Sequence, residues 1–271
     1  MNITIKNYVA AVAMLMIISL APGKLHAEDT DATSNFLPNI YGKSLTTPVG
    51  WGAAYGTVFA GAAVESRAPY AHGAAFSNHT GDGGAAIGLG IGNPVDNLGL
   101  QATLTQYDMT GWNRYGMSFQ VHRYLGSASS IGVGAQNLML SSGSDSEQSY
   151  YIVYSKGVLS SSFLNKDNST TRLHYSIGAG TGQYGNKTQD DILAGKGKHG
   201  TYVFGNIAYE LFNQFNVITD WNGMNLNAGI SKTFLISDSF PLVITAGAVD
   251  LTGYSGDGVR YIVAVGTGIT L

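Results

Sequence analysis

The C-terminal end of the chain alternates strictly between two kinds of side chain. A strand over residues 260–271 carries large apolar groups on one face, interrupted only by Thr267; they are Tyr261, Val263, Val265, Ile269 and Leu271. The other face carries small or polar groups around a single Ile262; they are Ala264, Gly266, Gly268 and Thr270. In a soluble sheet the polar face is usually longer and more charged. This period-two pattern therefore favours a strand with lipid on one side and a wet interior on the other.

The N-terminal end has the features of an export signal. Lys6 precedes an apolar run over residues 8–20, and small residues follow up to Ala27. A membrane-spanning helix needs about 20 apolar residues, so the run is too short to span, and a retained anchor is the less favoured alternative. We expect a signal peptide over residues 1–27, cleaved after Ala27. An N-terminal periplasmic segment (28–48) and a β-barrel domain (49–271) would follow.

Composition excludes several classes of protein. Without Lys6 and Lys24 of the signal, the chain has 12 basic and 17 acidic residues, a formal charge of −5, which gives no basic stripe for nucleic acid. The absence of cysteine excludes disulfides and thiolate chemistry. Only 11% of residues are charged, against about 25% in soluble domains. No apolar run after residue 27 is long enough for a spanning helix, so a membrane protein of this sequence must be a closed barrel.

Alternating segments recur along the whole chain after the signal. Twelve segments read as strands: 49–63, 84–92, 98–107, 115–124, 130–137, 149–156, 173–182, 202–211, 215–221, 225–234, 242–249 and 259–271. Their lengths are close to the roughly 9–11 residues that a tilted membrane strand needs. The fold class predicted is therefore all-β, a transmembrane antiparallel up-and-down barrel of about 12 strands, with 10 or 14 left open.

The connections between these strands test the barrel independently. Bacterial barrels have short periplasmic turns and longer extracellular loops. With the N-terminus in the periplasm, long and short linkers alternate in the expected phase, apart from two. The linker 157–172 is long for a turn, and the linker 222–224 is short for a loop.

Aromatic residues near the predicted strand ends fit girdles at the bilayer boundaries, although aromatics are common in any strand. They are Trp51, Tyr107, Tyr115, Tyr124, Tyr150, Tyr202, Trp221 and Tyr261.

The polar faces of the strands would line the barrel interior. The candidate lumen-lining residues are Gln101, Thr103, Gln120, His122, Gln136, His174, Asn206, Glu210, Asp220 and Asn227. They are mostly neutral hydrogen-bonding groups with two acids and no arginine or lysine. Such a lining suits neutral polar solutes such as sugars, or it plugs itself with side chains and water. A barrel of 12 strands lies between filled and open sizes.

Candidate catalytic and metal-binding patterns are weak. His122 and His174 form either a proton-sensitive or catalytic pair or two hydrogen-bonded interior residues. Ser118 and Ser176 lie two positions from these histidines, about 7 Å along a strand and too far for a direct hydrogen bond. Two Gly-Asp-Gly runs, 81–83 and 256–258, read as tight turns before strands rather than as metal loops. No catalytic, cofactor or metal site is assigned.

Together, the signal peptide, the alternating strands, the absence of cysteine and the apolar last strand resemble Gram-negative outer-membrane β-barrels. The resemblance implies outer-membrane lipid around the barrel and recognition of the last strand, Tyr261–Leu271, by the barrel-assembly machinery. In that class the last residue is usually aromatic; here it is Leu271. The Gly-Asp-Gly runs and the run PLVITA at 241–246 are loosely similar to uncharacterised bacterial barrels linked to exopolysaccharide secretion.

Three functions are compatible with these observations. The favoured one is an integral outer-membrane barrel with a channel, transport or envelope-structural role and a weakly charged lumen that accepts a small neutral solute or glycan. The alternatives are an outer-membrane enzyme that modifies lipid or glycan, and a soluble exported β-sandwich or adhesin.

Overall fold

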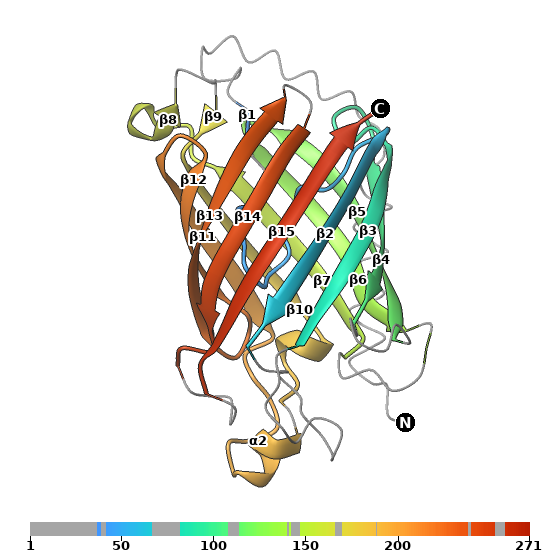
Figure 1. Ribbon diagram of the computed structural model, residues 1–271, viewed down its shortest axis with the longest axis vertical. Coiled ribbons are helices and arrows are strands. Elements are labelled where there is room, and N and C mark those ends of the chain that lie inside the picture. The colour runs from blue at the N-terminus through green and yellow to red at the C-terminus, as the bar shows by residue number, and fades with distance from the viewer. Residues whose placement is uncertain are drawn as a thin grey trace.

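Twelve antiparallel strands close into one barrel (Figure 1). The computed structural model describes residues 37–38, 42–66, 82–107, 114–139, 141, 147–165, 170–187, 189–237, 240–252 and 258–271. The barrel strands are β2 (Thr57–Glu65), β3 (Asp82–Gly92), β4 (Gly99–Gln106), β5 (Tyr115–Gly126), β6 (Ser129–Met139), β7 (Ser149–Gly157), β10 (Leu173–Gly180), β11 (Val203–Phe212), β12 (Phe215–Trp221), β13 (Leu226–Ser237), β14 (Phe240–Val249) and β15 (Arg260–Thr270). Each strand pairs with its neighbours along the chain, and β15 closes the barrel on β2.

Alternation along the strands places large apolar side chains on the outside. On β15, Tyr261 is 65% exposed and Val263 is 49% exposed, while Ala264 and Gly266 face inward. Ile177 on β10 and Ile87 on β3 are likewise exposed on the outer face. The closed ladder pairs the backbone N–H and C=O groups of neighbouring strands. The belt of exposed apolar side chains around it suits a lipid environment. The prediction of a transmembrane antiparallel barrel of about 12 strands is confirmed, at 12.

The two ends of the barrel differ in the length of the linkers that they carry. The turn end carries the linkers 93–98, 127–128, 158–172, 213–214 and 238–239. The loop end carries the linkers 66–81, 107–114, 140–148, 181–202, 222–225 and 250–259, and the short helix α2 (Gln189–Leu193) lies there (Figure 1). Strand β2 begins and strand β15 ends at the turn end, as an even number of strands requires.

The two linkers of unexpected length have local explanations. The long linker 158–172 folds into the 3₁₀ turn η1 (Ser161–Phe163) and the strands β8 (Leu164–Asn165) and β9 (Thr170–Thr171), and β9 pairs in parallel with β1 (Leu37–Pro38). The short linker 222–225 is a tight turn: the Asn222 side chain accepts hydrogen bonds from the backbone N–H groups of Met224 and Asn225. Gly223 there has φ +99°, which suits glycine.

The first barrel strand is shorter than predicted. It begins at Thr57 rather than Val49, and residues 42–56, here called the luminal segment, lie inside the barrel instead (Figure 1). Residues 49–63 were therefore wrongly predicted as one strand. The proposed signal peptide and most of the segment 28–48 lie outside the described residues, as does part of each Gly-Asp-Gly run. In the part of the chain that is described, no helix is long and apolar enough to cross a membrane.

Candidate functional site in the barrel lumen

On one side, the luminal segment is hydrogen-bonded to the wall formed by β11, β12 and β13. Asp220 on β12 accepts hydrogen bonds from the backbone N–H groups of Leu45 (3.1 Å) and Thr46 (2.8 Å). Asn206 and Asn227 flank Asp220 in register on the adjacent strands. These two amides donate to the hydroxyl groups of Thr47 and Thr46, each over 3.0 Å. A row of three predicted luminal residues therefore holds one turn of the segment.

A buried lysine supports the same attachment nearer the turn end. The Lys43 ammonium donates to Asn216 Oδ1 and lies 3.9 Å from a carboxylate oxygen of Glu210. Burial lowers the pKa of Lys43 to about 8, and the Glu210 carboxylate offsets part of that effect. Moving a charge out of water costs free energy unless the charge is paired. The hydrogen bond to Asn216 and the nearby Glu210 carboxylate offset that cost for Lys43.

The opposite side of the segment is held by the wall of β4 to β7. The backbone N–H of Gly50 donates to Ser155 Oγ, and Ser130 Oγ donates to the carbonyl of Gly50, both over 2.7 Å. Gln120 Nε2 donates to the carbonyl of Val49 over 2.9 Å, and Ala53 N–H donates to Gln101 Oε1 over 2.9 Å. Hydrogen bonds to both walls therefore span the lumen through this segment.

Trp51 is a buried aromatic residue of the segment. Its ring meets His174 edge to face at 5.7 Å, and its neighbour Gly52 packs so closely on His122 that a Cβ there would lie 2.7 Å from the imidazole Nδ1. Nδ1 of His174 and Nε1 of Trp51 are buried with no hydrogen-bond partner among the described residues, while the His122 ring lies within reach of the Gln120 and Gly52 backbone. The two histidines thus both pack against the luminal segment, His174 at Trp51 and His122 at Gly52.

The serines next to these histidines are bound to other groups. Ser176 Oγ lies 2.7 Å from Ser155 Oγ, and Ser118 Oγ accepts the backbone N–H of Asn137 at 3.4 Å. His174 Nε2 lies 2.7 Å from Thr171 Oγ1. The described residues contain no group of three or more metal-ligating side chains.

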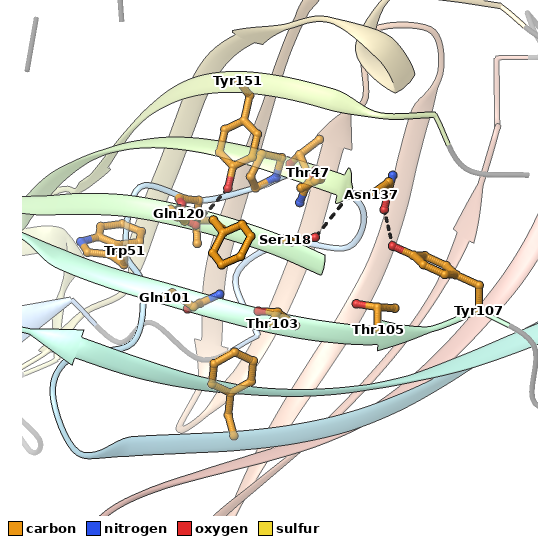
Figure 2. Close-up of a pocket in the computed structure, with 15 residues that line it drawn as sticks. Thr47, Trp51, Gln101, Thr103, Thr105, Tyr107, Ser118, Gln120, Asn137 and Tyr151 are labelled. Atoms are coloured by element: carbon orange, nitrogen blue, oxygen red, sulfur yellow. Dashed lines mark hydrogen bonds between the residues drawn. The ribbon is translucent and has the colours of Figure 1, made fainter. Parts of the chain in front are cut away.

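A cavity of about 440 Å³ lies between the luminal segment and β4 to β7 (Figure 2). Gln101, Thr103, Gln120 and Gln136, all predicted to line the lumen, line it together with Trp51. The remaining lining residues come from the segment, β2 and the strands around it: Thr47, Pro48, Val49, Phe59, Thr105, Tyr107, Ser118, Phe119, Asn137 and Tyr151. None of these side chains carries a charge. The cavity runs from Trp51 toward the loop end, where Tyr107 donates to Asn137 Oδ1 over 2.6 Å (Figure 2).

Two predicted girdle aromatics therefore have other roles. Trp51 belongs to the luminal segment, and the Tyr107 hydroxyl is directed at Asn137 beside the cavity. The ten predicted luminal residues fall into three groups: four line the cavity, three hold the segment at Asp220, and His122, His174 and Glu210 surround Trp51 and Lys43.

The residues that the sequence pattern did not place in the lumen are the segment itself and two cations. Lys43 pairs with Glu210, and Arg260 of β15 pairs with Glu65 and with Asp250, the latter at 2.7 Å. Lys43 and Arg260 are thus each paired with at least one carboxylate, whereas Asp220 is held by hydrogen bonds. Lys43 stands in a stretch without alternation, and no local signal shows that it turns inward.

The wall of β14, β15, β2 and β3 is lined mostly by small residues, and the luminal segment approaches it at Gly90 and at Gly247. Ala63 faces inward between Ala264 and Gly84, yet it is exposed. A Cβ placed on Gly266 would meet only backbone atoms, the nearest at 3.6 Å. This wall therefore leaves space beside Ala63 and Gly266, whereas Phe59 fills the space at Gly88.

An apolar cluster closes the loop end over β7, β10 and β11. Tyr184, in the 3₁₀ turn η2 (Gly182–Tyr184), packs against Phe204 at 4.4 Å between ring centres and meets Tyr151 edge to face. Burial raises the pKa of the Tyr184 hydroxyl far above its usual value, so this hydroxyl stays protonated and donates to Gln136 Oε1. Together with the luminal segment, this cluster leaves open the cavity and the space beside Ala63 and Gly266 among the described residues.

Comparison with known proteins finds solved structures of low identity to this chain. No family model and no curated protein sequence matches the chain. The backbone is similar to the NanC porin (TM-score 0.46, 9% identity, covering 79% of this chain and 100% of that one) and to the KdgM porin in complex with disordered oligogalacturonate (0.45, 11%, 79% and 99%). It is also similar to the outer membrane phospholipase A from Escherichia coli (0.44, 11%, 80% and 97%).

Proposed function

We propose that this protein is an outer-membrane channel for small neutral polar solutes, constricted by the luminal segment. The observation that carries the proposal is the way the lumen is filled. A polar segment is held across it by hydrogen bonds, an uncharged cavity lies on one side of the segment, and space remains beside Ala63 and Gly266 on the small-residue wall. A barrel that served only as a rigid support would be expected to fill its interior with interlocking side chains, as small barrels do.

The proposed location and partners follow from the outer surface and the sequence ends. The apolar belt supports contact with membrane lipid. The expected signal peptide, cleaved after Ala27, supports export, and the last strand, Tyr261–Leu271, is the proposed contact for the barrel-assembly machinery. Fractionation of cells should recover the protein in the detergent-resistant outer membrane, with Glu28 as its first residue. Recovery as a soluble periplasmic protein would contradict this location.

Conductance in planar bilayers tests the channel directly. The wild-type protein should show small or intermittent currents, and a variant in which residues 43–53 are replaced by a Gly-Ser linker of equal length should show larger, steady ones. The matched control is Leu193→Ser, a change at an exposed residue of α2 outside the barrel. Liposome swelling should then show passage of neutral sugars ahead of charged sugars of the same size. Absence of current from both proteins, each shown to be folded by its gel shift on heating, would overturn the proposal.

A further inference from the structure

We propose that the cavity beside the luminal segment is a binding site for a neutral saccharide, of mono- or disaccharide size. The proposal rests on the proposed channel function and names the solute class that the channel holds. At about 440 Å³, the cavity falls within the range of roughly 300–1,000 Å³ typical of small-molecule sites. It is bounded toward the turn end by Trp51 and the backbone of the luminal segment, so a solute that enters from the loop end meets a floor (Figure 2).

The charge of the lining selects a neutral ligand. Every side chain that lines the cavity is uncharged. The luminal cations Lys43 and Arg260 already pair with carboxylates on other strands, and neither lines the cavity. A carboxylate or ammonium group entering this space would give up water without gaining a partner of opposite charge, which costs considerable free energy. An uncharged polyol avoids that cost.

The hydrogen-bonding groups of the lining suit many hydroxyl groups at once. Gln101, Thr103 and Thr105 follow each other on the same face of β4 and point into the cavity (Figure 2). The hydroxyls of Thr103 and Thr105 have no partner among the described residues, and Gln101 uses only its carbonyl oxygen, on Ala53. Gln136 on β6 likewise uses only its carbonyl oxygen, which leaves its amide N–H groups. Hydroxyls that both donate and accept can meet sugar hydroxyls of either orientation, and the free amides add donors.

Aromatic faces complete the site. Trp51 and Phe59 both line the cavity, from the luminal segment and from β2. The flat apolar face of an aromatic ring suits the C–H face of a sugar ring, while the amides and hydroxyls bind its edge. Since Thr47, Val49 and Trp51 belong to the luminal segment, a saccharide in this site touches the constriction itself.

Saccharide binding is measured on the full-length processed protein, folded in a detergent without a sugar headgroup. The probes are neutral disaccharides of gluco, galacto and manno configuration, with galacturonic acid and glucosamine as acidic and basic counterparts. Binding is followed by tryptophan fluorescence and calorimetry. We expect millimolar dissociation constants for at least one neutral sugar and binding at least tenfold weaker for the charged ones. Equal affinity for a charged sugar, or no binding by any neutral sugar, would overturn the proposal.

Matched variants locate the binding site. The double substitution Thr103→Val and Thr105→Val keeps side-chain size and removes the two free hydroxyls, and it should weaken binding about tenfold. The control is Thr245→Val, an inward-facing threonine of β14 that does not line the cavity, and it should leave affinity unchanged. Wild-type affinity in the double variant overturns the site. Because binding is measured in detergent, it separates the two proposals: binding without conductance refutes the channel and keeps the site, whereas conductance without binding does the reverse.

Discussion

The carboxylate of Asp220 and the backbone N–H of Thr46 lie 2.8 Å apart although 174 residues separate them in the chain. The same carboxylate binds the N–H of Leu45 and the side-chain amide of Asn227. It is therefore the point where the luminal segment is tied most firmly to the barrel wall, because one charged acceptor serves several donors at once.

Replacing Asp220 by alanine should loosen the constriction. Each hydrogen bond to a charged group contributes roughly 1.5–3 kcal/mol, and the substitution removes those to Leu45 and Thr46 together. Single-channel recordings should show larger or more frequent openings than in the wild type. The control is Asp96→Ala, which removes an acid from the linker 93–98 at the turn end, where it accepts only from Asn93 and lies outside the lumen. Identical recordings from Asp220→Ala and the wild type would contradict the role given to Asp220.

A disulfide should lock the segment in place. The chain has no cysteine, and the side chains of Thr47 and Asn206 touch at 3.0 Å, so Thr47→Cys with Asn206→Cys gives one defined pair. The oxidised protein should conduct no more than the wild type and should fluctuate less. A reductant should restore the fluctuations, and Thr47→Cys alone should not respond to it. Conductance that is indifferent to the redox state would show that solutes pass without movement of the segment.

The constriction should become tighter as the pH rises from about 8 to about 10. The pKa of Lys43 is about 8 while the luminal segment is held against the barrel wall (the seated state), against 10.5 for a free lysine. If the segment leaves the wall, Lys43 therefore binds more protons across this pH interval. Raising the pH therefore favours the seated state, and open probability should fall. Glu210, Asn216 and His174 face this lysine, and the charge of Glu210 favours its protonated form. The variant Lys43→Met should lose the dependence; a rise in conductance with pH, or the same fall in Lys43→Met, would refute the assignment.

Removing the last strand should prevent closure of the barrel. β15 pairs with β14 on one side and with β2 on the other, so deletion of residues 261–271 exposes two strand edges. We expect loss of the heat-modifiable band and of outer-membrane recovery. The substitution Leu271→Phe, which supplies the aromatic end usual in the resembling class, should keep both. An intact heat-modifiable form of the truncated protein would contradict the proposed assembly role.

The barrel was predictable from the sequence because its signal is local. Every second residue of a membrane strand faces lipid, so the two faces of β15 can be predicted from its own sequence, without reference to β14 or β2. The number of strands followed from counting such segments. The two linkers of unexpected length do not alter that count, because one forms a small sheet and the other is a turn stabilised by Asn222.

The luminal segment was not predictable in the same way. Val49, Trp51, Ala53 and Tyr55 alternate with small residues, which is the pattern of a strand, so residues 49–56 were interpreted as part of the predicted strand 49–63. Gly50 and Gly52 have a different function here: they let the backbone approach Ser130 and His122 closely. Partners such as Asn216 and Asp220 lie more than 170 residues away, so only the closed barrel brings them to the segment.

The luminal segment enters and leaves the barrel at the same end. Before it, Leu37–Pro38 pairs with β9 at the turn end, and after it, Thr57 begins β2 at that end too. A loop of this kind can be drawn out toward the turn end without any part of it crossing the membrane, and a force from the loop end pushes it in the same direction. An agent that pulls on the segment has to act from the side of the turns.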